Sequence, residues 1–317
     1  MALLHRRSLL ATAALAAPSI ILSRKMAFAD NTKLFRIGYQ KASVTLVLSK
    51  AKKTFEAKLA PLGWQVSWAE FTSGPPMLEA LAANAIDFAF TGEPPVIFAQ
   101  AAHTDLVYIA ATRPSPKAVG ILKPAGSKLN NVADLKGKQV AVAKGSSAHY
   151  LLVAALAHAN VPYESVTKIF LQPADARAAF ASGAVDAWSI WDPFYAGAQE
   201  AGASLLSSGE GLMANRGFYT ASRQFASQHQ DILSHAITVL NDQEQWEQAN
   251  QDATAQLIAP VIGLPAPVLK TWFARQKYGV DKLTPEIFAD QQKIADAFYK
   301  LGLIPAKINV TDDAWTG

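Results

Sequence analysis

The 317-residue sequence contains no cysteine, which excludes a disulfide, a thiolate metal site and a cysteine nucleophile. Its six histidines show no ligand spacing such as H-E-x-x-H, so no metal is expected. Neither G-x-x-x-x-G-K-[ST] nor G-x-G-x-x-G after a strand is present, which argues against nucleotide binding. The G-x-S-x-G motif of hydrolases is also missing. These absences favour a binding function without a cofactor over catalysis.

The chain has no excess of one charge once its first segment is set aside. Lys and Arg together number 29, and Asp and Glu together number 25. Residues 1–29 hold Arg6, Arg7, Arg24 and Lys25 and no acidic residue, so 25 bases face 25 acids in the remainder. The basic balance therefore belongs to the first segment and does not indicate a nucleic-acid partner.

That first segment has the features of an export signal. A basic start is followed by an apolar run from Leu9 to Leu22, which at 14 residues is shorter than the roughly 20 that span a bilayer. Ala27-Phe28-Ala29 before Asp30 predicts cleavage after Ala29 and a periplasmic location. The stretch RRSLL resembles a twin-arginine signal, which exports folded proteins, and an ordinary secretory leader is the alternative.

Strand-like and helix-like segments alternate from Leu34 to Gln224. This alternation predicts an α/β protein with mostly parallel sheets and helices on both faces. The strands are expected at residues 34–40, 64–71, 86–92, 106–113, 117–124, 138–145, 166–172, 186–192 and 216–224, and the alternation also runs through residues 202–209. One helix is expected around Leu46 to Leu59. Beyond Gln224 the pattern is helical, with a long run from about Gln228 to Ile262.

Four expected strands end in small polar joints that open a helix. The joints are Thr72–Pro76, Thr91–Pro95, Gly145–His149 and Gln172–Asp175. Ligands of open α/β sheets bind at the carboxyl ends of the strands, where helix starts offer unpaired N–H groups and partial positive charge. The joints therefore predict an oxyanion site, although ordinary helix caps have the same composition. Apart from Lys144 they carry little positive charge, which favours a weakly basic monoanion held by neutral dipoles over phosphate.

The strand at residues 186–192 ends in two further candidates. Trp191 could pack on the apolar tail of a ligand or belong to the core. Asp192 could cap the next helix or meet a cationic group. Ser146 or Ser147 beside His149 would suit a hydrolase, but nearness in sequence does not place a base against a nucleophile.

Several ordered motifs resemble one family. They include FRIGYQK, EFTSGPPMLEALAANAIDFAFTGEPP, KGKQVAVAKGSSAHYLL, DAWSIWDPFYAGA and LIPAKI. From Leu34 to Ile308 the chain is similar to the aliphatic sulfonate-binding proteins of ABC importers, within the nitrate, sulfonate and taurine binding-protein group. The resemblance implies a two-lobed periplasmic binding protein-like fold of type II, without catalysis. It also implies a monomer that delivers an alkanesulfonate to an inner-membrane permease with its ATPase, for sulfur acquisition.

The resemblance further implies lobe boundaries and site residues. Lobe 1 would comprise residues 30–120 and 218–317, and lobe 2 residues 121–217. The cleft positions carried over by matching motif are Gln40, Ser73, Gly74, Thr91, Gly92, Ser146, Ser147, His149 and Trp191, and we add Glu93, Gly145 and Asp192 from the same joints. Family members often have Asp where this chain has Glu93, which leaves the preferred tail open.

Other ligands and one other class of protein remain open at this point. Taurine, nitrate, bicarbonate or an aromatic sulfonate could replace the alkanesulfonate. Taurine carries an ammonium group, so it would require a carboxylate such as Glu93 or Asp192 in the cleft. The same fold could also serve an enzyme resembling the pyrimidine-precursor synthases of thiamine biosynthesis. The export signal and the lack of a metal or histidine-base pattern count against this enzyme.

Overall fold

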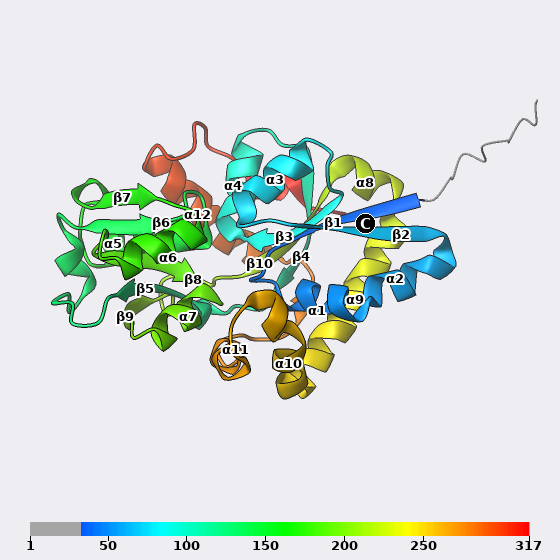
Figure 1. The fold of residues 1–317 in the computed structure, drawn as a ribbon. Coiled ribbons are helices and arrows are strands. Elements are labelled where there is room, and N and C mark those ends of the chain that lie inside the picture. The colour runs from blue at the N-terminus through cyan, green and yellow to red at the C-terminus, as the bar shows by residue number, and fades with distance from the viewer. Residues whose placement is uncertain (1–32, 317) are drawn as a thin grey trace, which may run out of the picture. The chain divides into compact units, whose positions relative to one another are not determined.

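The computed structural model describes residues 33–316, so the predicted leader and its cleavage site after Ala29 lie outside the described residues. The described residues belong to one compact unit. They form two sheets (Figure 1), with strand orders β11-β4-β10-β3-β1-β2 and β7-β6-β8-β5-β9. The chain passes from the first sheet to the second and back, and we refer to the two parts as the first-sheet half and the second-sheet half.

The first-sheet half combines the start and the end of the chain. Its strands are β1 (Lys33–Tyr39), β2 (Trp64–Glu70), β3 (Phe88–Gly92), β4 (Leu106–Thr112), β10 (Gly217–Ser222) and β11 (Val280–Asp281). Its earlier helices are α1 (Val44–Lys52), α2 (Thr54–Leu59), α3 (Gly74–Ala82) and α4 (Glu93–Ala101). Its later helices are α8 (Arg223–Gln228), α9 (Gln230–Ala249), α10 (Gln251–Ile262), α11 (Ala266–Phe273) and α12 (Pro285–Lys300).

The second-sheet half is continuous in sequence. Its strands are β5 (Val119–Lys123), β6 (Gln139–Val142), β7 (Thr167–Phe170), β8 (Ala187–Trp191) and β9 (Ser204–Ser208). Its helices are α5 (Ser147–His158), α6 (Pro173–Ala181) and α7 (Phe194–Glu200). The lobe boundaries implied by the resemblance remain a prediction, because all described residues belong to a single compact unit.

Each crossing between the halves introduces an antiparallel strand. β1 pairs in parallel with β2 and β3, whereas β10 lies antiparallel between β3 and β4. In the second sheet β6 pairs in parallel with β7 and β8, whereas β5 lies antiparallel between β8 and β9. The prediction of mixed, mostly parallel sheets flanked by helices is confirmed.

Two predicted helices are broken, and one strand was not predicted. The helix expected at residues 46–59 is divided between α1 and α2 at Lys53, whose φ of 55° is left-handed. The helix expected at residues 228–262 begins at Gln230 and is interrupted at Asn250, where the side chain donates to the Trp246 carbonyl over 2.8 Å. Such local bonding competes with helix continuation. The missed strand β11 has only two residues, too few to give a pattern.

One hydrophobic cluster runs through both halves. It joins apolar side chains of α3, α4 and α12 to those of β5, β6 and α5. Phe298 of α12 is central, with ring centroids 5.2 Å from Phe98 and 5.7 Å from both His149 and Tyr150. The helix α12 therefore holds the two halves together beside α4 and α5, as Figure 1 shows.

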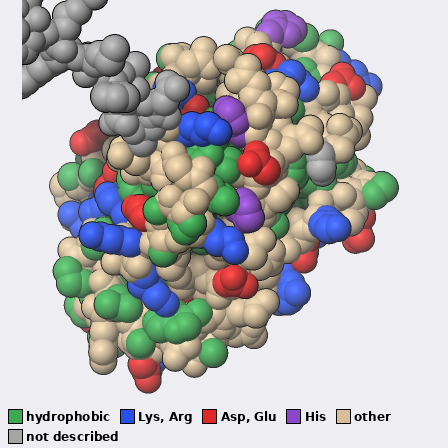
Figure 2. Space-filling view, turned by 90° about the vertical axis from the view of Figure 1, so that its right-hand side faces the viewer, with side chains coloured by type: hydrophobic (Ala, Val, Ile, Leu, Met, Phe, Trp, Pro, Cys, Tyr) green, Lys and Arg blue, Asp and Glu red, His purple; other side chains and the backbone are tan. Residues whose placement is uncertain are grey.

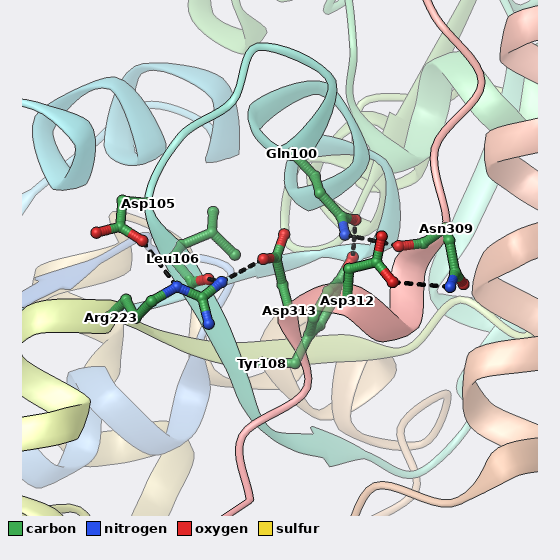
Figure 3. A network of polar contacts seen from close by, with 8 residues as sticks. All are labelled: Gln100, Asp105, Leu106, Tyr108, Arg223, Asn309, Asp312 and Asp313. Carbon is green, nitrogen blue, oxygen red and sulfur yellow. Dashed lines mark hydrogen bonds and ion pairs between the residues drawn. The ribbon is translucent and has the colours of Figure 1, made fainter.

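A polar network ties the end of the chain to the first sheet (Figure 3). The Arg223 guanidinium donates to Asp105 over 2.8 Å, to the Leu106 carbonyl over 3.1 Å and also to Asp313. Nearby, Gln100 of α4 donates to the Asn309 carbonyl over 3.1 Å. These bonds explain why the C-terminal segment packs on the first-sheet half.

The visible surface in Figure 2 has basic and acidic side chains interspersed over it, in keeping with the balance of charge outside the leader. Among residues 33–316 no single helix has the length and apolar character needed to cross a membrane. The helices α10 and α11 have this length and apolar character only when taken together, and they are bent by 114° relative to each other.

Candidate functional site

A cavity of about 130 Å³ lies between the two halves. A cavity of this size can hold several water molecules or a small ligand. Eight of the twelve candidate residues line it: Gln40, Gly74, Thr91, Gly92, Ser146, Ser147, Trp191 and Asp192. Ser73, Glu93, Gly145 and His149 lie outside the lining. Three of the four polar joints therefore reach the cavity, and the Gln172 joint instead accepts a 3.2 Å hydrogen bond from Thr72.

The joints do open helices, as predicted, but they offer unequal sets of N–H donors. In α3, the first residue, Gly74, is followed by Pro75 and Pro76. In α4, the first residue, Glu93, is likewise followed by two prolines. Because proline has no N–H, each first turn in the first-sheet half has lost two donors. The start of α5 contains no proline, so Ser147 and Ala148 keep theirs.

Two glycines allow hydroxyl groups to approach the backbone at the cavity. A Cβ atom on Gly74 would lie 1.9 Å from Thr91 Oγ1, and one on Gly92 would lie 2.1 Å from Ser147 Oγ. Both distances are far below van der Waals contact, so a side chain at either position would displace the hydroxyl. Ser147 reaches Gly92 from the opposite half, which brings the two helix starts together.

The three candidate hydroxyl groups on the cavity wall, those of Ser146, Ser147 and Thr91, differ in their bonding. Ser146 donates its proton to the Ala143 carbonyl over 2.6 Å and caps α5 by accepting from the His149 N–H over 3.2 Å. The Ser147 hydroxyl forms no hydrogen bond within residues 33–316. Thr91 Oγ1 is buried and has no partner in the described part of the chain. A buried hydroxyl without a partner is costly, so Thr91 is the best hydroxyl donor for a ligand.

His149 supports the site from behind. Its ring is fully buried, accepts the Gly145 N–H at Nδ1 over 3.1 Å and lies 2.6 Å from the Tyr163 hydroxyl at Nε2. Burial, with help from Lys144 and Lys168, lowers the pKa of His149 to about 4. The imidazole is therefore neutral near pH 7, and it braces the glycine turn instead of facing the cavity. The ring packs against Phe170 and Phe298 and does not line this cavity, so its place in the cleft stays a prediction.

Glu93 is buried at the start of α4, away from the cavity lining. Burial raises the pKa of Glu93 to about 8, although the backbone N–H groups of Arg216 and Asn215 oppose the shift. The side chain is therefore largely protonated near pH 7. It cannot serve as the carboxylate for a taurine ammonium group, as the sequence interpretation allowed.

The wild-type protein is expected to lose stability as the pH rises, and Glu93→Gln is expected to remove this loss. The folded state holds the proton up to about pH 8, whereas an unfolded glutamic acid releases it near 4.5, so stability falls as pH rises between these values. The shift corresponds to as much as about 5 kcal/mol at 1.36 kcal/mol per unit. Urea unfolding at pH 5.5 and 8.5 measures the free energy of unfolding of the wild type and of the variant. An equal decrease between the two pH values in both proteins would contradict a protonated Glu93.

Asp192 both caps a helix and meets a cation. Its carboxylate accepts the Ala196 N–H over 2.9 Å, and both of its oxygens lie 3.1 Å from Arg275 Nη1. Burial raises the pKa of Asp192 to about 6, and Arg275 limits the rise. Because Arg275 follows α11, this ion pair joins the first-sheet half to the second. Asp192 lines the cavity, but its charge is already matched.

Sequence reasoning missed several residues of the cavity wall, above all Arg216 and Glu244. The Arg216 side chain is only 10% exposed, its Nε has no partner within the described residues, and its nearest carboxylate, Asp281, is 3.9 Å away. The prediction that neutral dipoles surround the ligand is therefore incomplete. No sequence signal marks Arg216, because it lies on the irregular segment that returns the chain to the first sheet.

Among residues 33–316, no three His, Cys, Asp or Glu side chains are grouped so that they could hold a metal ion. The cavity wall offers hydroxyls, amides, backbone N–H groups, the Arg216 guanidinium and the Lys277 ammonium, which can bind an anion, beside the carboxylates of Asp192 and Glu244.

Comparisons with known proteins agree with this description. A model of the "NMT1/THI5 like" family matches residues 66–253. An aliphatic sulfonates-binding protein of Escherichia coli (strain K12) is 39% identical over 90% of both chains. One of Bacillus subtilis (strain 168) is 36% identical over 88% of this chain and 85% of its own.

The solved structures extend the likeness to the fold. The alkanesulfonate-binding protein SsuA from Xanthomonas axonopodis pv. citri, bound to MOPS, superposes with a TM-score of 0.86 at 40% identity, covering 89% of this chain and 98% of its own. The desulfurization enzyme DSZB shares only the fold, with a TM-score of 0.67 at 15% identity, covering 89% of this chain and 96% of its own. The predicted periplasmic binding protein-like fold is confirmed.

Proposed function

The chain belongs to the NMT1/THI5-like family, and from this premise we propose that it is the periplasmic substrate-binding component of an ABC importer for aliphatic sulfonates. Relatives that share more than a third of its residues over most of its length are named as sulfonate-binding proteins. The desulfurization enzyme DSZB, which has the same fold, is only 15% identical in sequence. The chain is accordingly a binding protein and not an enzyme.

The unsatisfied donors of the cavity carry the proposal. A sulfonate group stays ionised at physiological pH and offers three oxygen acceptors, so it needs donors and no proton exchange. Thr91 supplies a buried hydroxyl without a partner, and Arg216 supplies a nine-tenths buried guanidinium with a free Nε. The N–H groups at the starts of α3 and α5 lie on the same wall. Together they suit one monoanionic head group.

The remaining wall suits an organic tail. Phe90, Trp191, Tyr219 and Tyr278 line the cavity, and their rings can pack on methylene groups. Nitrate and bicarbonate have no tail and would leave this surface uncovered. The aromatic wall therefore favours an organic sulfonate over these small anions.

The proposed function also includes the export of the chain, its location and its transport partners. In this proposal the leader is removed after Ala29, with the twin-arginine route favoured, and the mature chain works as a monomer in the periplasm. It delivers its ligand to an inner-membrane permease with its ATPase, which supplies the cell with sulfur. Closure of the two halves would remove water and strengthen each hydrogen bond to the sulfonate.

Thr91→Ala is expected to weaken binding of butane-1-sulfonate about tenfold, because one hydrogen bond to a charged group is lost. Calorimetry measures the affinity, with sulfate, nitrate and taurine as competing ligands. Ser73→Ala is the matched control, since the Ser73 hydroxyl is equally buried and without a partner in the described chain but lies off the cavity. Equal affinity for the two variants would contradict the role of Thr91, and a wild-type protein that binds no sulfonate would contradict the function.

A further inference from the structure

Besides Arg216, the cavity wall carries Lys277, Asp192 and Glu244, and Glu244 has no role in the function proposed above. Glu244 of α9 lines the cavity together with Tyr219 of β10 and Tyr278. Its side chain is buried, with a relative exposure of 4%. Within residues 33–316 no Lys or Arg lies within ion-pair distance of it. The carboxylate is therefore a buried charge on the wall that lacks a countercharge.

The contacts of Glu244 fix its position without neutralising it. One carboxylate oxygen accepts the Gly279 N–H, and the other lies 3.5 Å from the Tyr219 hydroxyl. On the same helix, Glu247 accepts from Thr45 over 3.3 Å through one oxygen, and its other oxygen is buried without a partner in the described residues. A group held in this way by neutral donors keeps its capacity for an ion pair.

Several charged groups surround Glu244, and Lys277 lines the same cavity. Arg113, which follows β4, lowers the pKa of Glu244, whereas Asp281 of β11 raises it. Glu247 lies on the same helix as Glu244, and Lys52 of α1 lowers the pKa of Glu247. The Tyr219 and Tyr278 hydroxyls are neutral, because burial raises the pKa of both. Burial also raises the pKa of Glu244 to about 7, against the Gly279 N–H and the Tyr219 hydroxyl. A ligand cation would favour the ionised form.

The aromatic residues beside Glu244 suit the same kind of group. Tyr219, Tyr278, Phe90 and Trp191 all line the cavity. Aromatic faces attract alkylammonium ions, and a carboxylate beside them adds a direct charge. The two carboxylates that the sequence suggested for this task are not available, since Glu93 lies off the cavity and Asp192 is paired with Arg275.

The wall therefore carries two buried charged groups of opposite sign, Arg216 and Glu244, beside the exposed Lys277 and the paired Asp192. Arg216 and Glu244 are both nine-tenths buried or more, and the Arg216 Nε has no partner within the described residues. We propose that Glu244 makes the cavity selective for zwitterionic sulfonates, with its carboxylate receiving an alkylammonium group while Arg216 and the helix starts hold the sulfonate. This inference rests on the proposed function and narrows its substrate class.

A pair of isosteres tests the proposal. 3-(Trimethylammonio)propane-1-sulfonate carries a permanent cation, and 4,4-dimethylpentane-1-sulfonate replaces its nitrogen by carbon. Calorimetry at pH 8 is expected to show at least tenfold tighter binding of the zwitterion. Because the cation requires ionised Glu244, this preference should shrink as the pH falls below about 7, whereas binding of the carbon isostere, which carries only the sulfonate charge, should stay nearly constant.

Glu244→Gln is expected to abolish the preference by weakening only the zwitterion. Glu93→Gln is the matched control, because it neutralises a buried carboxyl that does not line the cavity. If Glu244→Gln fails to fold, the pH dependence of the wild-type preference still tests the proposal. An isostere that binds as tightly as the zwitterion at pH 8, or a preference that survives Glu244→Gln, would overturn it. Binding of neither sulfonate would instead contradict the proposed function.

Discussion

Arg216→Met is expected to lower the affinity for butane-1-sulfonate by about 100-fold. The guanidinium lies on the cavity wall with its Nε free of partners in the described residues, so it can make two charge-assisted bonds to a sulfonate. Bonds to charged groups contribute about 1.5–3 kcal/mol each, and about 3 kcal/mol corresponds to this loss. Calorimetry at moderate salt measures it directly.

The same variant should be no less stable than the wild type without ligand. The nearest carboxylate to Arg216, Asp281, is 3.9 Å away, so the fold gains little from this buried cation. Arg113→Met is the matched control, because Arg113 also pairs with Asp281, at 3.6 Å, but is 55% exposed and does not line the cavity. An equal loss of affinity in the two variants would show that Arg216 acts through Asp281 and not on the ligand.

Arg275→Met is expected to reduce the free energy of unfolding by about 3 kcal/mol at pH 8. It leaves Asp192, which is 2% exposed, as a buried carboxylate without its cation. The pKa of Asp192 is about 6 beside Arg275 and would rise further without it. The unfolded state releases this proton near 3.8, so the deficit grows as pH rises above 6 and is smaller at pH 5.

Urea unfolding at pH 5 and pH 8 separates this cause from lost packing. Arg275 also lies 3.8 Å from the centroid of the Tyr195 ring and donates to Gln199, and those contacts do not depend on pH. The double variant Asp192→Asn/Arg275→Met should recover most of the deficit at pH 8. A deficit of the same size at both pH values, unrelieved in the double variant, would contradict the explanation.

The sequence predicts the strands and the positions of the helix starts well, because both depend on local patterns. Residues that follow a buried strand must lie at its carboxyl edge, which is why Thr91, Gly92 and Ser147 were expected on the wall. His149 shows the limit of this rule. It lies in the first turn of α5, where a small rotation about the helix axis decides between the cavity and the core.

The remaining wall depends on tertiary packing. Glu244 lies in the stretch NDQEQWEQ, whose polar composition is typical of an exposed helix face, yet Gln243, Glu244 and Glu247 are all buried. Arg216 was expected to begin the strand at residues 216–224, but it lies just before β10, which begins at Gly217. Neither the burial of these residues nor their approach to the cavity follows from a local pattern, because elements far apart in sequence create both.

The position of α12 restricts how the two halves can separate. Phe298 belongs to an apolar cluster shared by both halves, and Figure 1 places α12 far from the facing ends of α7 and α11. Any opening that leaves this cluster intact is a rotation with α12 as its fulcrum. Such a rotation would separate α7 from α11 most and would break the contact between Arg275 and Asp192.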